Sequence, residues 1–536
     1  MRQEIKKYIQ ESLQEIIQKE NLGKFSALEF QVFYPPQEKF GDLTTNVALI
    51  LASKLPLSSL DLAQKIKNEL EVKIKSEKIK KIEIVKPGYI NFFYTQKYWQ
   101  EKVTIINKQG EKFGDSKINY DKFINNEFIS ANPTGPLHLG NGRGGYWGDV
   151  LSNVWKTTGA QVVNEYYIND AGEQILKLGH SVLKDKEAVY QGGYIDKLNK
   201  KIPSNIKNDY QKIGKWAAQE ILKKEIKPVI KDKMNINIDS WISEKNEIIK
   251  NGWREKALQI LREKKLTYQQ DGAEWFQSSQ FGDEKDRVLI KKDGSKTYFA
   301  SDCGYVFYKI NQGYNYLVEI WGADHHGYIQ RFQAVAKALG FQGKIKFIIT
   351  QLVRLIENGE EVKMSKRKGN VIYIEDLINK VGSDVVRFFF LMRSVNTHLD
   401  FDLKLAQEKS NQNPVYYIQY VLARSHSISE KIKKINLEKD ELDLSLLQHD
   451  KEIALIKQIY RLPEVLKEIS ENLEVHRLTH YAISLADYFH SFYEVCKIID
   501  EKNIPLTQAR YELVLATENV LKKTLKILGI KRIKKM

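Results

Sequence analysis

The stretch KFINNEFISANPTGPLHLGNGRGGYWGDVLSNVWKTTGAQVVNEYYI, residues 122–168, joins two apolar runs through a glycine-rich segment. The runs at 122–129 and 160–168 have the length and the β-branched content of strands. Between them, apolar residues at helical spacing predict a helix that starts near residue 138 and ends at Gly159. The order strand, turn, helix, strand predicts a βαβ unit of a parallel sheet.

The start of this helix is a candidate phosphate site. The carboxyl end of a strand and the amino end of the next helix offer free N–H groups and a positive dipole. His138 and Asn141 lie three residues apart and share a face of the first turn, while Gly140 leaves the backbone open to a ligand. Neither of the two common glycine-rich phosphate-binding motifs, G-x-G-x-x-G and G-x-x-x-x-G-K-[ST], is present here. A capping histidine with glycines for close packing is the structural alternative.

Composition indicates a soluble, ordinary globular protein. The 536 residues are 42% hydrophobic and 28% charged, which predicts more than one domain. Because apolar runs are short and the amino terminus lacks the apolar region of a signal peptide, we expect a cytoplasmic chain without membrane contact. The two cysteines, Cys303 and Cys496, exclude a disulfide framework and a zinc site built from cysteines, and we expect no protein-bound structural metal.

The net charge of +16 favours a polyanionic partner such as nucleic acid, because basic side chains release the counterions of phosphates. A lysine-rich proteome is the alternative explanation, and composition alone does not separate the two.

Three composition regimes predict three domains. Residues 1–110 combine amphipathic helices with a lysine-rich strand region, which predicts an N-terminal α+β domain. Residues 111–395 mix short apolar strands with helices and hold most of the glycine, which predicts a Rossmann-like, doubly wound parallel-sheet core with insertions. Residues 396–536 have long helical periodicity and little glycine, which predicts an all-α helical bundle.

A second motif, EVKMSKRKGN at 361–370, concentrates cations in a short segment. Lys363 and Lys366 flank Met364 and Ser365, and ammonium groups on a loop suit a leaving polyphosphate. The alternative interpretation is a solvated basic loop. This interpretation is less favoured because the segment follows a candidate phosphate site in the same α/β core.

The motifs now resemble a known family. HLGN and KMSK are similar to the two signatures of class I aminoacyl-tRNA synthetases. NEFISANPTGPLHLGN, YYINDAGEQI, YFASD, WGADHHGY and NPVYYIQY are similar to segments of bacterial arginyl-tRNA synthetases and follow the family's order. The resemblance runs from end to end of the chain.

The resemblance implies a two-step reaction with L-arginine, ATP with Mg²⁺, and tRNA(Arg). The arginine carboxylate attacks the α-phosphate of ATP, and the acyl group of the adenylate then passes to the 2′-OH of the terminal adenosine. It implies that His138, Asn141, Lys363 and Lys366 are catalytic. The ATP-binding set that it implies is Gly135, His138, Gly140, Asn141, Gly322, Asp324, His325, Met364, Ser365 and Lys366.

The resemblance also implies an arginine pocket. Residues that match the family's ligands for the ammonium and carboxylate are Glu127, Ser130, Asn132 and His138, and Tyr298 and Asp302 match the pair that binds the guanidinium. From the residues alone, a helix N-cap for Asp302 and a core aromatic for Tyr298 are the favoured interpretations. Asp324 and His325 are neighbours in sequence, a spacing that does not suit a shared metal ion, so a nucleotide contact is preferred.

Tyr416, Tyr420 and Arg424 are the candidate tRNA-binding residues. Their spacing puts them on one face of a helix, on which single-stranded bases stack, and the resemblance implies an anticodon-binding domain here. A buried stripe of the bundle is the alternative.

One departure from the family concerns the first signature, which usually ends in a second histidine where this chain has Asn141. An amide still donates a hydrogen bond but carries no charge. A class I ligase for another amino acid and a catalytically silent tRNA-binding paralogue are the alternative functions. We expect a monomer, because no association surface is readable in the sequence.

Overall fold

The computed structural model describes residues 1–19, 30–74, 77–362, 372–435 and 442–533. The chain forms two compact units, of which the first comprises residues 1–110, 427–460 and 488–519, and the second comprises 111–426, 461–487 and 520–536. The three domains expected from composition stay a prediction.

The first unit begins with the predicted α+β region. Its antiparallel sheet has the order β1-β2-β4-β3. The strands are β1 (Val32–Phe33), β2 (Leu43–Thr45), β3 (Ile79–Val85) and β4 (Tyr89–Tyr94). The helices of this region are α1 (Arg2–Lys19), α2 (Val47–Ala52), α3 (Ser59–Lys73) and α4 (Gln96–Gln109). Ile5, Ile9, Leu13 and Ile16 of α1 are buried, as the amphipathic pattern requires.

The second unit is built on a five-stranded parallel sheet with the order β12-β11-β5-β6-β7. Its strands are β5 (Phe123–Glu127), β6 (Gln161–Ile168), β7 (Ser240–Ser243), β11 (Tyr316–Gly322) and β12 (Lys344–Thr350). The chain builds outward from β5 in one direction to β7 and then returns to build β11 and β12 on the other side. This order confirms the predicted doubly wound, Rossmann-like core.

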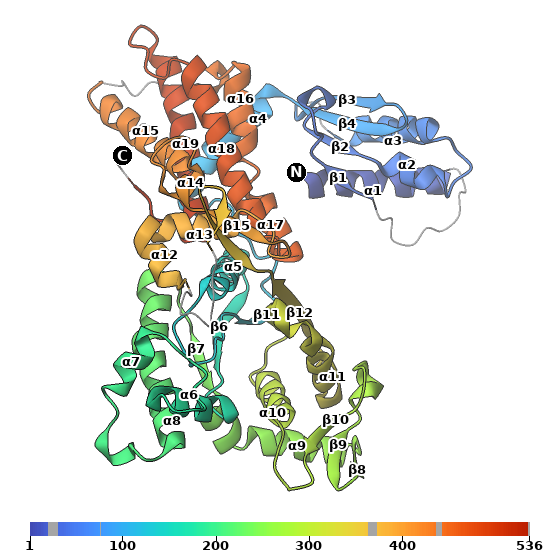
Figure 1. The fold of residues 1–536 in the computed structure, drawn as a ribbon. Coiled ribbons are helices and arrows are strands. Elements are labelled where there is room, and N and C mark those ends of the chain that lie inside the picture. The colour runs from blue at the N-terminus through green and yellow to red at the C-terminus, as the bar shows by residue number, and fades with distance from the viewer. Residues whose placement is uncertain (20–29, 75–76, 363–371, 436–441, 534–536) are drawn as a thin grey trace. The chain divides into compact units, whose positions relative to one another are not determined.

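Helix α5 (Leu139–Thr157) is the predicted helix of the opening βαβ unit, and it packs on one face of this sheet (Figure 1). Glycine permits the close approach: a Cβ at Gly148 would lie 2.4 Å from the Phe128 ring. The Asn126 side chain points to the same face and donates to the Gly148 carbonyl at 2.9 Å. Because side chains alternate along a strand, the next residue, Glu127, points to the opposite face.

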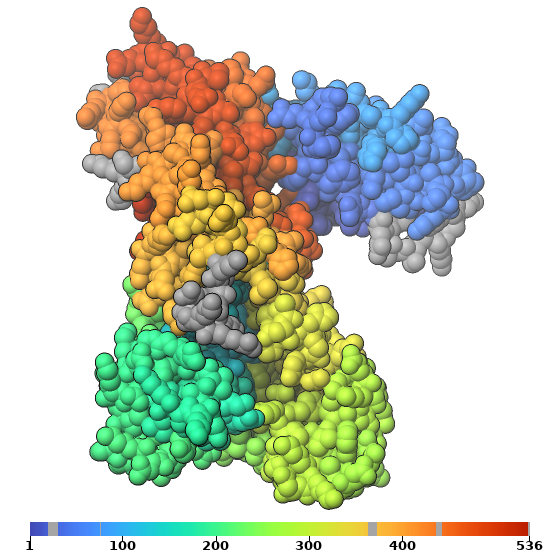
Figure 2. Space-filling view, viewed as in Figure 1, coloured from blue at the N-terminus to red at the C-terminus, as the bar shows by residue number. Residues whose placement is uncertain are grey.

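Two insertions flank the sheet, and the surface is hollowed between them (Figure 2). One consists of α6 (Glu173–Leu183), α7 (Gly193–Asn199) and α8 (Tyr210–Ile221). The other contains α9 (Trp253–Glu263), α10 (Tyr298–Asn311), α11 (Ile329–Leu339) and an antiparallel sheet of β8 (Thr267–Gln270), β9 (Ala273–Phe276) and β10 (Arg287–Ile290). A buried apolar cluster, which includes Leu258, Phe276, Cys303 and Val335, joins the helices to this small sheet.

The carboxyl-terminal region is helical apart from one strand among its described residues. A small sheet contains β13 (Val353–Glu357), β14 (Glu360–Glu361) and β15 (Leu399–Asp402). The helices near this sheet in the sequence are α12 (Ile374–Val381), α13 (Ser383–Leu391) and α14 (Leu403–Gln407). They are followed by the helices α15 (Pro414–Ile432), α16 (Asp450–Ile459), α17 (Leu462–Asn472), α18 (His476–Val495) and α19 (Ile504–Leu528). The helical bundle is confirmed, and none of the described helices is long and apolar enough to cross a membrane.

Glycines also bring α6 and α8 into close contact. A Cβ at Gly214 would lie 1.8 Å from the Ile175 carbonyl oxygen, which is backbone and has little freedom to yield. We expect Gly214→Ala to lower the free energy of unfolding by about 3 kcal/mol, as measured by urea denaturation. Gly193→Ala in α7 is the control, because its Cβ would meet no atom within 4 Å. Equal stability of the two variants would contradict this account of the packing.

Candidate active site

The carboxyl ends of β5 and β11 meet where the strand order reverses. In doubly wound sheets, ligands bind in the crevice at this switch point. The segment that leads to His138 follows β5, and Asp324 follows β11 directly. The fold therefore brings two predicted site segments, separated by almost two hundred residues of sequence, to one edge of the sheet.

The start of α5 is held by a reciprocal cap. His138 has extended backbone angles at the N-cap, and its backbone N–H donates to Asn141 Oδ1 at 3.1 Å. The His138 side chain is exposed. Asn141 thus orders the helix start through its carbonyl oxygen, and its amide N–H₂ is the group that remains to donate outward.

The predicted nucleotide glycines have packing reasons of their own. A Cβ at Gly140 would lie 3.2 Å from the His138 ring, and one at Gly135 would lie 3.0 Å from the Tyr194 hydroxyl. The Tyr194 hydroxyl donates to the Thr134 carbonyl at 2.9 Å. Both glycines therefore leave room for a neighbouring side chain that shapes the turn before α5.

Three glutamates lie side by side on adjacent strands of the sheet, and α10 packs next to them. Figure 1 shows α10 below β11. Glu319 of β11 pairs in register with Glu127 of β5, and Glu127 pairs with Glu165 of β6. All three are buried, and we call Glu127, Glu165 and Glu319 the glutamate row. Lys309 of α10 reaches the row with its Nζ 2.6 Å from Glu127 Oε2 and 2.6 Å from Glu319 Oε1.

Within the glutamate row, the pKa of Glu127 shifts in the opposite direction from the pKa values of the other two. Burial favours its neutral form, but the charge of Lys309 and hydrogen bonds from Glu319, Lys309 and Tyr305 together hold the pKa of Glu127 below its usual range. Burial raises the pKa of Glu165 and raises that of Glu319 still further. The Tyr305 hydroxyl lies 2.7 Å from Glu127 Oε2 and 2.6 Å from Glu165 Oε1. The Tyr305 hydroxyl has a single proton, which these two carboxyl oxygens share or compete for.

Ser130 ties Glu127 to the next strand. Its Oγ donates to Glu127 Oε1 at 2.8 Å and accepts the Tyr167 backbone N–H at 3.0 Å. Ile129 and Ser130 have φ values of 69° and 34°, a left-handed conformation that is costly for a β-branched residue. Asn132, two residues further along, is exposed at the mouth of this turn.

The two structural alternatives for Tyr298 and Asp302 are wrong. Thr297, whose Oγ1 accepts the Ala300 N–H at 3.3 Å, caps α10, so Asp302 lies beyond the first turn and is not the cap. Tyr298 is 55% exposed and is not a core aromatic. Its hydroxyl accepts the Glu173 backbone N–H at 2.9 Å, which joins α10 to the start of α6.

A second acid, Glu244, which the sequence did not single out, lies close enough to Asp302 to repel it. Burial raises the pKa of Asp302 to about 7, and repulsion by Glu244 adds to the effect, while Arg331 opposes it. Glu244 is itself buried, and burial raises its pKa as well. It directly follows β7, so an acid at the carboxyl end of a strand was the available signal. Two carboxyls that repel each other, one buried and one half-buried, suit a cationic group.

Family models match three parts of the chain: the arginyl tRNA synthetase N terminal domain at residues 3–94, the class I (R) tRNA synthetase catalytic domain at 205–387, and the DALR anticodon binding domain at 418–536. The arginine–tRNA ligase of Bacillus subtilis is 39% identical over all of this chain and 99% of its own length. The chain belongs to the arginyl-tRNA synthetase family. The corresponding ligase of Bacillus velezensis is 40% identical over the same shares.

Solved structures of the family share the fold. Thermus thermophilus arginyl-tRNA synthetase superposes with a TM-score of 0.78 at 18% identity, and each chain is covered completely. The Plasmodium falciparum arginyl-tRNA synthetase has a TM-score of 0.76 at 20% identity, with 100% of this chain and 99% of that one covered. Family membership confirms the predicted enzyme class, an ATP-dependent class I aminoacyl-tRNA synthetase.

The remaining predicted catalytic and ATP-binding residues lie in two further segments. Lys363, Met364, Ser365 and Lys366 lie outside the described residues. Gly322 ends β11, and Asp324 and His325 lie in the short 3₁₀ helix Ala323–Tyr328, where both side chains are exposed. Among the described residues, no group of three or more His, Cys, Asp or Glu side chains could hold a metal ion.

The candidate tRNA residues lie on α15. Tyr416, Tyr420 and Arg424 are half-buried, and the Arg424 guanidinium lies 4.7 Å from the centre of the Tyr420 ring. Ile418 and Val421 fill the buried face of the helix instead. The three candidates therefore border the surface of the bundle and are not its buried stripe.

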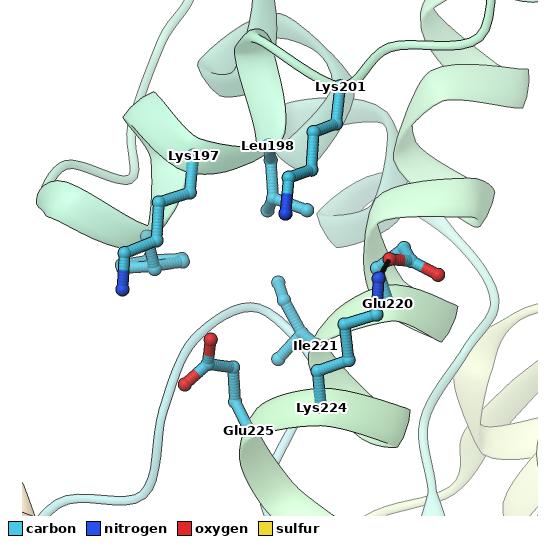
Figure 3. Close-up of a pocket in the computed structure, with 8 residues that line it drawn as sticks. Lys197, Leu198, Lys201, Glu220, Ile221, Lys224 and Glu225 are labelled. Carbon is cyan, nitrogen blue, oxygen red and sulfur yellow. Dashed lines mark hydrogen bonds and ion pairs between the residues drawn. The ribbon is translucent and has the colours of Figure 1, made fainter.

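A small pocket lies between α7 and α8 (Figure 3), and Tyr194, whose hydroxyl contacts the turn before α5, is one of its lining residues. Its volume is about 60 Å³, which suits a few water molecules and is far too small for a nucleotide. Lys197, Lys201 and Lys224 line it with Glu220 and Glu225, and Lys224 pairs with Glu220. The charges are nearly balanced, so this pocket has no strong preference for anions.

Proposed function

We propose that this chain attaches L-arginine to tRNA(Arg) in protein synthesis, through an arginyl-adenylate formed at the switch point of the core sheet. The observation that carries the proposal is the distribution of acids along α10. The anionic Glu127 lies under one end of the helix, and the repelling pair Asp302 and Glu244 lies near the other. Arginine has a cation at each end, and it complements both.

The arginine would lie with its ammonium group toward Glu127 and its guanidinium toward Asp302 and Glu244. Tyr298 borders the guanidinium end, and Ser130 and Asn132 border the ammonium and carboxylate end together with His138. Binding of a guanidinium would lower the pKa of Asp302 and remove its repulsion with Glu244. This complementarity disfavours neutral amino acids, which would leave buried charges unpaired.

The nucleotide would enter as MgATP at the start of α5. His138 and the amide of Asn141 would contact phosphates, with Gly135 and Gly140 in the turn and Gly322, Asp324 and His325 on the β11 side. The set from the second signature would be Lys363, Met364, Ser365 and Lys366, which would stabilise charge on the departing pyrophosphate.

In the first step a carboxylate oxygen of arginine attacks the α-phosphorus of ATP, the bond to the bridging oxygen breaks, and pyrophosphate leaves. In the second step a ribose hydroxyl of the tRNA attacks the acyl carbon, and AMP leaves. Both steps need positioning and charge stabilisation more than a strong base. Tyr416, Tyr420 and Arg424 would contact single-stranded tRNA bases.

Charging of tRNA with each radiolabelled amino acid tests the proposal. We expect esterification of arginine alone. Preference for another amino acid would support a class I ligase of different specificity, and absence of charging with any amino acid would support a silent tRNA-binding paralogue. Sedimentation or light scattering would test the expected monomer.

The pH dependence of arginine use gives an independent check. Asp302 has a pKa of about 7 in the free chain, and it binds a guanidinium only when it is ionised. Its carboxyl is increasingly protonated below that pH, so we expect kcat/KM for arginine to fall about tenfold per pH unit. The measurement is a pH profile of aminoacylation from pH 5.5 to 8.5. A profile that is flat through pH 7 would contradict the assignment.

A further inference from the structure

One face of α10 carries four polar side chains at helical spacing. Tyr298, Asp302, Tyr305 and Lys309 are separated by four, three and four residues, so they follow one another along the helix. The first two belong to the proposed guanidinium end of the site. The last two contact the glutamate row, and they anchor the other end of the same helix face.

The anchor formed by Tyr305 and Lys309 is buried and contacts several strands. The Lys309 side chain has no solvent exposure, and its Nζ lies 3.6 Å from Glu165 Oε1 in addition to its two shorter contacts. Through Lys309 and Tyr305, α10 is attached to three adjacent strands at once. Contacts from two successive turns to three strands restrict both the rotation of the helix and its movement along its axis.

Stability alone does not require this anchor. The opposite face of α10 already packs through Ala300, Cys303 and Val306 into the apolar cluster with α9 and α11. Buried ion pairs contribute little net stability compared with apolar residues of similar volume, because desolvation offsets the attraction. A lysine and three glutamates on the sheet-facing side therefore call for a reason beyond holding the helix.

We propose that Lys309 and Tyr305 are positioning residues that fix the distance between the carboxylates of Glu127 and Asp302, and thereby the length of amino acid that the site accepts. The inference rests on the proposed function, in which those carboxylates bind the two cationic ends of arginine. Asp302 and Lys309 are seven residues apart, which is about 10 Å along a rigid helix. A shift of α10 would change the fit of the side chain between the two ends.

The test uses Lys309→Met and Tyr305→Phe in the full chain with tRNA. The substrates are arginine and its homologue that is one methylene shorter, 2-amino-4-guanidinobutanoate. In each variant we expect KM for arginine to rise about tenfold and KM for ATP to stay within about twofold. We also expect the ratio of kcat/KM for arginine to that for the shorter homologue to fall about tenfold, because a methylene is normally discriminated by that order.

Lys102→Met is the matched control. Lys102 is another buried lysine, in α4, and its ammonium lies 3.7 Å from the centre of the Tyr98 ring, so this change removes a buried cation far from the site in sequence. It should leave the ratio between the two substrates unchanged. If Lys309→Met does not fold, Tyr305→Phe decides alone, because it keeps the lysine and the ring.

A wild-type ratio in the folded variants, or equal increases in KM for arginine and for ATP, would overturn the inference. Failure of the proposed function has a different signature, because the unchanged chain would then not esterify arginine at all.

Discussion

Asp302→Asn is expected to lower kcat/KM for arginine about 100-fold, which corresponds to about 3 kcal/mol. The amide keeps the volume of the side chain and removes the charge that would pair with a guanidinium. Glu244 remains and prevents a complete loss of binding. The measurement is steady-state aminoacylation at pH 8, where the carboxyl of the unchanged chain is ionised.

Two readouts make this result specific. KM for ATP should not change, because Asp302 lies on the amino-acid side of the proposed site. Discrimination against citrulline, a neutral analogue of arginine, should weaken, since the variant no longer leaves a charge unpaired beside it. An Asp302→Asn variant that uses arginine normally would remove this residue from the proposed pocket.

Glu127→Gln is expected to lower the free energy of unfolding by about 3–5 kcal/mol at pH 7, because Lys309 then lacks its ionised partner in a buried setting. Glu319→Gln should have the smaller effect, since burial raises the pKa of Glu319 well above its usual range and so favours its neutral form, which the amide resembles. Urea denaturation of the two variants measures the difference directly. Equal effects would show that the charge is not concentrated on Glu127.

The pH dependence of that difference has a definite sign. The pKa of Glu127 is lowered on folding, so its contribution to stability is present at neutral pH and above its ordinary pKa. The contribution is lost as the pH falls through the lowered value. The gap between the unchanged chain and Glu127→Gln should therefore narrow in acid and stay constant above about pH 6.

The local sequence pattern was sufficient to predict the strands and the helix of the opening βαβ unit. The apolar run that ends at Glu127, the helix that begins after His138 and the strand that follows Gly159 all lie in one stretch of chain, where periodicity and turn residues act over a few positions. The ordered motifs were sufficient for the family. The three-regime division and the individual site roles stay predictions.

The partners of Glu127 were beyond the reach of sequence reasoning. Glu165 and Glu319 each stand in an apolar strand, an unusual place for an acid, but nothing local says that they neighbour Glu127. Lys309 and Glu244 do not belong to any motif that the sequence analysis recognised. For Asp302 and Tyr298, the sequence left a structural and a functional reading open, and only the position of Thr297 as the cap and the exposure of Tyr298 removed the structural one.

The sequence by itself determined the βαβ unit, the doubly wound core and the family, because these depend on residue types at short or ordered spacings. Only the tertiary structure decided in which direction the pKa of each buried glutamate shifts, and that Asn141 orders the start of α5 through its oxygen. Those properties depend on burial and on the register between strands that are far apart in the chain. A pKa or a hydrogen bond is set by whatever neighbours the fold brings within a few ångströms, and the order of residues along the chain does not specify them.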